Sequence, residues 1–241
     1  MSTLTVVRRT STSVRPSPIP ADRGGFEPAN CSQVSYAGKD TDRQEFLGMD
    51  ELSSAEVALA ALVPVLGTIT VDMLHLPTPC EGFDVAGLAD HLVGTVTMVG
   101  DSAGEDVSVT DGRPIDVRVA DAAETTIEAW RRRGTDGDVV FAGHVTAARL
   151  ALGVLSIELV VHGWDFAQAL HRPLPITAAH ADFVLGLARQ IITPDSRRTA
   201  GFDEPVPVTT DAAALDRLVA YTGRHPQCEC RPASDHRVKN G

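Results

Sequence analysis

The chain has 241 residues, of which 43% are hydrophobic, 22% charged and only 5% aromatic, as in a globular protein with an aliphatic core. Its formal net charge of -11 argues against binding to a nucleic-acid phosphate backbone, which requires a basic surface. No window of about 18 apolar residues stands out, so we expect no membrane span. We therefore expect a cytoplasmic protein with a small-molecule or protein partner.

Cysteine usage indicates a reducing compartment. Four cysteines in a chain of this length do not form a typical disulfide framework, and no apolar signal-peptide core precedes a cleavage site. Cys228 and Cys230, with His225 nearby, would suit a metal ion. A single cysteine pair in a polar terminus is more typical of solvent-exposed thiols.

The composition of the two ends differs from that of the middle. Residues 1–47 are rich in Ser, Thr, Pro, Arg and Gly without sustained periodicity, which predicts a disordered tail. An alternative is that the physiological protein starts at Met49. Residues 49–227 are predicted to form one folded domain, and residues 228–241 a loose C-terminal tail.

The first half of the domain predicts two helices. Apolar residues recur at intervals of three and four from Glu51 to about Met73, where Pro64 should kink the helix or start a second segment. A proline-containing and glycine-containing loop follows, and Asp84 can cap a second helix that runs to about Gly100. Residues 101–120 are polar and predict an irregular connection, with a short extended piece around Val117.

The second half predicts further helices joined by short links. The expected segments are a third helix Asp121–Arg132, a turn at 134–138, a fourth helix from Ala142 or His144 to Leu170, a fifth helix Thr177–Ile192, a Pro/Val-rich link and a short helix Asp211–Thr222. No credible series of alternating strands interrupts them. The sequence therefore predicts an all-α fold, a four-helix bundle with additional short C-terminal helices.

The fourth predicted helix carries three polar residues on one narrow stripe. At 100° per residue, His162 lies about 40° from Glu158, and Asp165 lies about 20° from Glu158 on the other side. Their neighbours are apolar, and a buried carboxylate without a partner is costly, a cost that a bound cation removes. The alternative is that Glu158 and His162 only pair with each other at i, i+4 spacing.

The second predicted helix supplies a further candidate ligand, His91. It borders the apolar stripe that contains Leu88 and Leu92, and in helix bundles metal sites are built from side chains on facing helices. A single histidine in this position more often hydrogen-bonds a carbonyl group at the edge of the core. The histidines at 75, 144, 171 and 180 show no ligand spacing among themselves, so we expect them at the surface or its boundary.

Two motifs carry a resemblance to a known family. Thr78-Pro-Cys-Glu-Gly-Phe-Asp-Val-Ala-Gly-Leu-Ala-Asp-His-Leu-Val-Gly is followed, about seventy residues later, by Glu158-Leu-Val-Val-His-Gly-Trp-Asp-Phe-Ala. Together they resemble the actinobacterial DinB-like (YfiT-like) metal-binding proteins, in particular the branch containing the metal-binding domain of mycothiol-dependent maleylpyruvate isomerase. Thr222-Gly-Arg-His-Pro resembles the closing motif of that branch. Phe83 and Gly87 depart from the family pattern.

The resemblance implies a helix bundle that binds a divalent cation, usually zinc, through His91, Glu158 and His162. Three protein ligands leave one position of a tetrahedral zinc site open, as in catalytic sites. The family further implies that the thiol mycothiol binds there as a thiolate and attacks a small electrophilic substrate, in a transferase or isomerase reaction. The alternative is a metal-binding sensor or partner module of the same fold without turnover. A monomer or a homodimer is expected.

Three further residues have predicted supporting roles. Asp165 would hydrogen-bond a ligand imidazole or act as a weak extra ligand, although an ion pair with an arginine is an alternative. Arg224 would bind an anionic substrate or the carboxylate of the thiol, unless it only interacts with a helix dipole. Cys80 is expected to be a small buried thiol.

Overall fold

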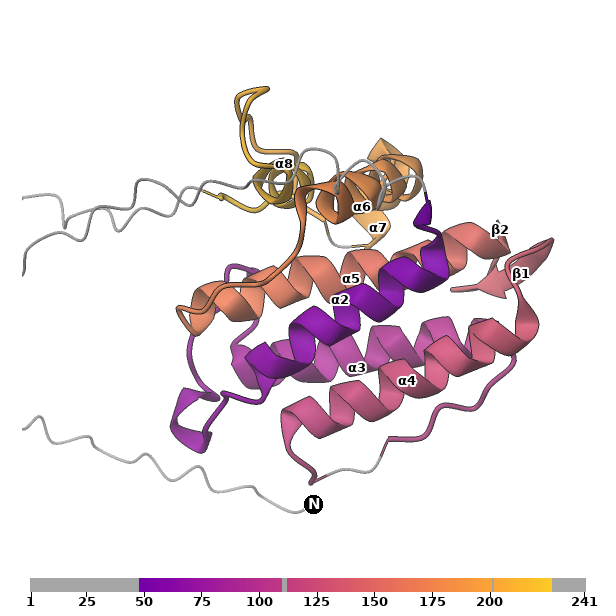
Figure 1. Ribbon diagram of the computed structural model, residues 1–241, viewed down its shortest axis with the longest axis horizontal. Helices are drawn as coiled ribbons and strands as arrows, with labels where there is room; N and C mark the ends of the chain where they lie inside the picture. Colours follow the sequence, from indigo (N-terminus) through magenta and orange to yellow (C-terminus); the bar gives the residue numbers. More distant parts are fainter. Residues whose placement is uncertain (1–47, 110–111, 201, 227–241) are drawn as a thin grey trace, which may run out of the picture. The chain divides into compact units, whose positions relative to one another are not determined.

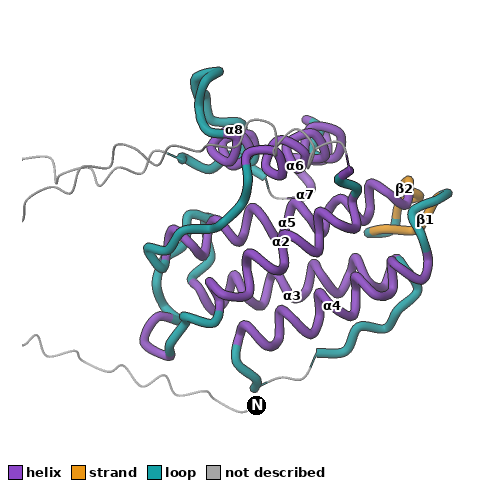
Figure 2. The backbone as a smooth tube through the Cα atoms, viewed as in Figure 1, coloured by secondary structure: helices purple, strands orange, loops and turns teal. Residues whose placement is uncertain are grey.

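The structure of the protein is a computed structural model that describes residues 48–109, 112–200 and 202–226. These residues form seven α-helices and one small hairpin, whose arrangement can be followed in Figures 1 and 2. Their bounds are α2 (Glu51–Leu66), η1 (a 3₁₀ turn, Val71–Met73), α3 (Val85–Ser102), α4 (Ile115–Arg133), β1 (Asp138–Phe141), β2 (His144–Ala147), α5 (Ala148–Ala169), α6 (Ala178–Ile191), α7 (Pro194–Ala200) and α8 (Ala214–Tyr221). The tails predicted for 1–47 and 228–241, and the thiols of Cys228 and Cys230, lie outside the described residues.

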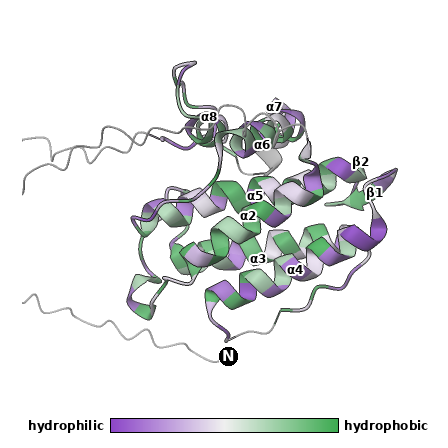
Figure 3. Ribbon diagram, viewed as in Figure 1, coloured by the Kyte–Doolittle hydropathy of each residue, from purple (hydrophilic) through white to green (hydrophobic). Residues whose placement is uncertain are grey.

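Four long helices form the bundle. Helix α2 packs against α4 and α5, α3 packs against α4 and α5, and α6 contacts both α5 and α8. In Figure 3, hydrophilic and hydrophobic residues alternate along α3 and α4, as expected of helices with one buried and one exposed face. The all-α prediction of a four-helix bundle with additional short C-terminal helices is confirmed.

Helix α5 is the central element of the bundle. Every residue from Leu155 to Ala167 is buried, so this helix is surrounded by protein along most of its length. Among the described residues, it is the one helix long and apolar enough to span a membrane by length and composition, and 89% of its most apolar window is buried inside the protein. The expectation that the chain has no such window is therefore wrong, although a buried core helix gives the same pattern.

Side-chain caps fix the starts of α2, α3 and α6. Asp84 accepts a hydrogen bond from the backbone N–H of Gly87 at 2.8 Å and begins α3, as predicted. Thr177 caps α6 in the same way, and Asp50 and Ser53 form a reciprocal capping box at α2. Helix α2 passes through Pro64 and ends two residues later at Leu66 instead of running to Met73; Gly67 is its C-cap residue, and the Thr68 hydroxyl donates to the carbonyl oxygen of Val65 at 2.7 Å.

Helix α4 corrects the sequence prediction. It begins at Ile115, not at Asp121, so the segment around Val117 is helical and not extended. Ile115 packs against the core and Val119 is fully buried four residues later, and this packing outweighs the β-propensity of the branched side chains.

The hairpin β1–β2 and helix α7 were not expected. Ala142 and Gly143 both have positive φ, 48° and 80°, which is the geometry of a two-residue type I′ turn. The fourth predicted helix therefore begins at Ala148, after β2. Within the predicted Pro/Val-rich link, Thr193 and Ser196 cap α7 reciprocally through backbone–side-chain hydrogen bonds of 2.8 and 3.2 Å.

Candidate metal centre

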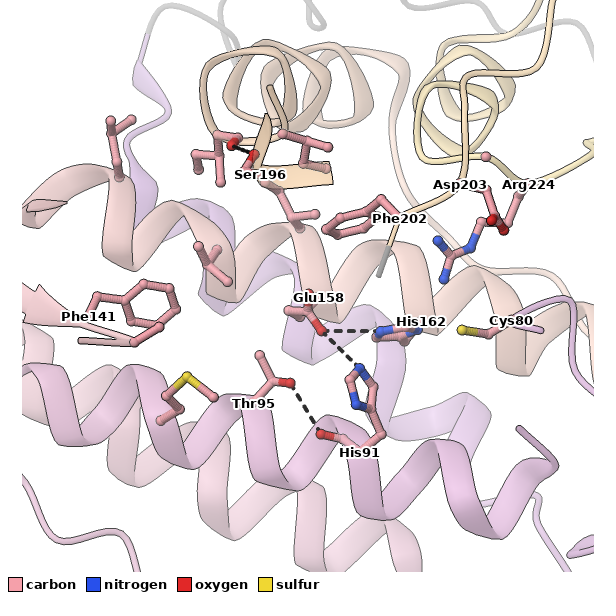
Figure 4. A pocket seen from close by; sticks show the side chains of 18 of the residues that line it. Cys80, His91, Thr95, Phe141, Glu158, His162, Ser196, Phe202, Asp203 and Arg224 are labelled. Carbon is pink, nitrogen blue, oxygen red and sulfur yellow. Dashed lines mark hydrogen bonds and ion pairs between the residues drawn. The ribbon is translucent and has the colours of Figure 1, made fainter. Parts of the chain in front are cut away.

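His91 on α3 and the pair Glu158 and His162 on α5 face each other across the bundle (Figure 4). Glu158 Oε2 lies 3.2 Å from His162 Nε2 and 3.8 Å from His91 Nε2. One potential ligand atom from each of the three residues lies within 4.8 Å of the others. The two imidazole rings are nearly perpendicular, at 88°, with centroids 5.1 Å apart. The arrangement is a candidate metal-binding group.

Two features of this group fit a cation. Glu158 Oε2 is buried, makes no hydrogen bond of good geometry in the described part of the chain, and meets only the two imidazole nitrogens, at ion-pair distance. His162 Nδ1 lies 3.0 Å from a carboxylate oxygen of Asp165, so a neutral His162 ring carries its proton on Nδ1 and directs the lone pair of Nε2 toward Glu158. Two facing lone pairs repel unless a proton or a metal ion lies between them. The donor set, two imidazoles and one carboxylate, is one that zinc accepts.

Without a cation, the charges of Glu158 and His162 compensate each other. Burial lowers the pKa of His162, but the carboxylates of Glu158 and Asp165 outweigh burial and raise that pKa well above its ordinary value. Burial raises the pKa of Glu158, whereas the charge of His162 lowers it, and the net shift is downward. Burial and the charge of His162 both lower the pKa of His91, which keeps that imidazole neutral.

Asp165 connects the candidate group to Arg224. The carboxylate of Asp165 is fully buried and accepts hydrogen bonds from Arg224 Nη2 at 2.9 Å and Nε at 3.3 Å. Arg224 Nη1 also donates to the carbonyl oxygen of Thr222 at 3.1 Å. Burial raises the pKa of Asp165, but its hydrogen bond with His162 and the charge of Arg224 produce a net lowering. Asp165 thus orients the His162 ring while Arg224 compensates its charge.

The loop before α3 adds two residues that sequence reasoning did not place in the site. Cys80 forms a second candidate group with His162 and Asp165, again with ligand atoms within 4.8 Å. Thr78 shapes this loop by donating hydrogen bonds to the carbonyl oxygens of Cys80 and Phe83, at 3.2 and 2.9 Å. The Phe83 ring lies 5.1 Å from the His91 ring, centroid to centroid. In the sequence, the position of the Thr-Pro-Cys motif just before the predicted cap Asp84 was the signal that could have placed this loop near the start of α3.

The other histidines fall into two groups. His75, His144 and His171 are exposed, as expected. His180 is fully buried, which corrects the prediction that it lies at the surface or its boundary. Its Nε2 atom lies 2.9 Å from the hydroxyl oxygen of Ser54, and this contact allows the ring to be accommodated in the core between α2 and α6.

A cavity of about 1020 Å³ opens beside the candidate group. Side chains from the loop before α3, from α3, the hairpin, α5 and the segments around 190–203 and 223–224 line it. Arg224 borders the cavity, although two of its nitrogen atoms point to Asp165. The side chain of His91 is 39% exposed, whereas those of Glu158 and His162 are 9% and 5% exposed, so a ligand would approach from the His91 side.

These observations define a mostly helical, bundle-like protein with a buried candidate metal-binding group of His, Glu, Asp and Cys residues. The chain is distantly related to two uncharacterized proteins of Mycobacterium tuberculosis, Rv0738 and MT0763. Each is 25% identical to it over 181 residues, which cover 73% of this chain and 98% of the relative. No family model and no solved structure matches the chain.

Proposed function

We propose that the protein binds one divalent cation, in the first place zinc, through His91, Glu158 and His162. We further propose that it uses the metal with mycothiol as cosubstrate, as a transferase or isomerase acting on a small electrophile. The observation that carries the metal site is the buried oxygen Glu158 Oε2, which faces two imidazole nitrogens without a hydrogen-bond partner among the described residues. The resemblance to the DinB-like family and the relationship to mycobacterial proteins support the choice of thiol.

The charge of the ligand set favours an anionic fourth ligand. Two neutral imidazoles, one carboxylate and a divalent cation together carry one positive charge. A zinc ion in such a site lowers the pKa of a coordinated thiol or water. Cys80 belongs to a separate candidate group with His162 and Asp165, so a cation held by His91, Glu158 and His162 would take a further ligand from the cavity.

The residues around the ligands hold this geometry. Asp165 fixes the tautomer and ring orientation of His162, and Arg224 keeps Asp165 ionised in a buried position. The Phe83 ring packs near the His91 ring. The cavity of about 1020 Å³ is large enough for a thiol and a small substrate to lie next to the three ligands.

Metal content and thiol binding test the proposal. Purified protein should bind about one equivalent of zinc, and His91→Ala and His162→Ala should each abolish this binding, whereas the exposed control His171→Ala should retain it. Mycothiol titrated calorimetrically should bind the zinc-loaded protein and not the metal-free protein. Absence of zinc binding would contradict the proposed metal site. Absence of mycothiol binding to the zinc-loaded protein would contradict the catalytic proposal.

A non-catalytic metal-binding module, such as a sensor or partner protein, is the second candidate. The almost complete burial of Glu158 and His162 favours it, because ligands of structural metal sites are shielded from solvent. The mycothiol titration separates the two candidates, since the module would bind zinc without thiol. In both cases we propose a cytoplasmic protein, and the net charge of -11 argues against a nucleic-acid partner.

A further inference from the structure

The cavity continues well beyond the candidate metal group. On α5, Leu150, Val154 and Ile157 line the cavity together with Glu158 and His162, at the three- and four-residue spacing of one helix face. With a rise of 1.5 Å per residue, Leu150 lies about 18 Å from His162 along the axis. The cavity is therefore elongated, with the metal group at one end.

The facing elements follow the same direction. On α3, Thr95 and Met98 continue the stripe that starts at His91, and all three line the cavity. Figure 4 shows Phe141 of the hairpin at the opposite side of the view from Cys80 and His162, with Glu158 between them. The part of the cavity lined by Met98, Phe141, Leu150, Val154, Ile157 and Ile191 is called the apolar arm below.

Charged side chains are confined to the metal end. The charged residues that line the cavity are Glu81, Glu158, Asp203 and Arg224. Glu81 adjoins Cys80 in the chain, and Figure 4 shows Asp203 beside Arg224. The apolar arm thus contains no Asp, Glu, Lys or Arg side chain among the described lining residues.

Thr95, Thr146 and Gln190 along the arm already have hydrogen-bond partners within the protein, and the exposed His144 of the hairpin also lines the cavity. Thr95 donates to the carbonyl oxygen of His91 at 3.3 Å, and Thr146 donates to that of His144 at 3.4 Å. Gln190 accepts from Arg149 and donates to a backbone carbonyl, at 3.3 and 3.2 Å. Because these groups are hydrogen-bonded without a ligand, an apolar molecule can fill the arm without leaving them unpaired.

We infer that the apolar arm holds the aliphatic or aromatic body of the substrate, while the electrophilic atom lies at the metal end. The substrate class is therefore a small electrophile with an extended apolar body and no charge on that body. The assignment of the reacting end rests on the proposed function, but the binding of an apolar chain in the arm does not.

A series of straight-chain alcohols from butanol to decanol tests the arm in metal-free protein. Affinity measured by calorimetry should increase roughly threefold to fourfold for each added methylene while the chain still fits. Affinities that do not change with chain length would overturn the inference. Because no metal is needed, this experiment can succeed even if the zinc site fails, and it can fail even if zinc binds.

Met98→Glu is the first variant, because this side chain lines the arm and is 42% exposed, so a charge there leaves the core intact. It should weaken decanol binding at least roughly tenfold. Val57→Glu is the matched control, because Val57 is 43% exposed on α2 and does not line the cavity, and it should leave binding unchanged. Equal effects of the two substitutions on decanol binding would contradict binding in the apolar arm.

Val154→Phe gives an independent readout should Met98→Glu fail to fold. The larger ring narrows the arm between the metal end and Phe141, so the gain in affinity with chain length should stop at a shorter alcohol than in the wild type. An unchanged length dependence in this variant would place the alcohols elsewhere and overturn the inference. Straight-chain thiols, whose sulfur would bind the zinc, should show the wild-type length dependence of the alcohols when titrated into zinc-loaded protein, and a flat series would show that the arm does not continue from the metal end and would overturn the inference.

Discussion

Replacing Asp165 with asparagine removes a buried negative charge and leaves the buried Arg224 guanidinium without its ionic partner. Asp165 is fully buried and Arg224 is 7% exposed, and their hydrogen bonds measure 2.9 and 3.3 Å. Loss of one partner from a buried ion pair costs about 3–5 kcal/mol, because the remaining charge stays desolvated. For a chain of this size, that corresponds to a decrease in Tm of about 6–20 °C.

Urea unfolding of the metal-free protein measures this loss directly. The matched control is Glu105→Gln, which breaks an exposed ion pair with Arg132 at 2.5 Å and should cost less than about 1 kcal/mol. The double variant D165N/R224M should recover much of the lost stability, because neither charge then remains buried. If D165N lowers the free energy of unfolding no more than Glu105→Gln does, the ion pair of Asp165 and Arg224 contributes far less to stability than its burial indicates, and the reasoning is refuted.

The same substitution should also weaken zinc binding. Asp165 accepts from His162 Nδ1, and loss of such a supporting carboxylate typically lowers metal affinity about 10–100-fold. Competition with a chromogenic zinc chelator measures the affinity of folded D165N at a temperature below its transition. An unchanged affinity would show that Asp165 does not determine the orientation of the His162 ring.

Two further predictions concern the core. Burial lowers the pKa of His180 below its ordinary value of 6.5 despite the contact with Ser54, so its stabilising contribution is present above pH 6.5 and is lost as the pH falls through this value toward the lowered pKa. Between pH 7.5 and 5.5, the free energy of unfolding measured with urea should therefore fall less for His180→Asn than for the wild type or the exposed control His171→Asn. An equal decrease in all three proteins would contradict this role of His180. Gly100→Ala should lower the free energy of unfolding by about 1–3 kcal/mol, because the added Cβ would lie 2.4 Å from Val107 Cγ2, and an unchanged urea midpoint would refute this crowding.

Local signals in the sequence were sufficient for most of the helices. Asp84 and Thr177 are side-chain caps whose effect depends on a few neighbouring residues, and both helices begin where these residues predict. The hairpin at Ala142 and Gly143 was missed because alanine rarely adopts a positive φ, so the usual Asn-Gly signal was absent. Helix α4 begins early because packing at Ile115, a long-range effect, outweighs local propensity.

Local spacing along one helix also made part of the candidate site predictable. The spacing on α5 places Glu158 and His162 on one face whatever the rest of the fold does, and Asp165 follows within one turn. His91 was already a candidate from its place beside the apolar stripe of the second predicted helix, and the resemblance to a known family joined it to this pair. Cys80 was not placed beside His162 because its position depends on how an irregular loop folds back onto α5, which periodicity does not report.

The burial of α5 has a consequence for how a metal ion enters and leaves. Residues from Leu155 to Ala167 are covered by the neighbouring helices, so exposing their amides requires separation of the bundle and not fraying of one element. Hydrogen–deuterium exchange around Glu158 and His162 should therefore be among the slowest in the domain. An ion at this position would enter and leave through the cavity while the protein stays folded. Its residence time would then depend on how open the His91 side is, and less on how often the protein unfolds.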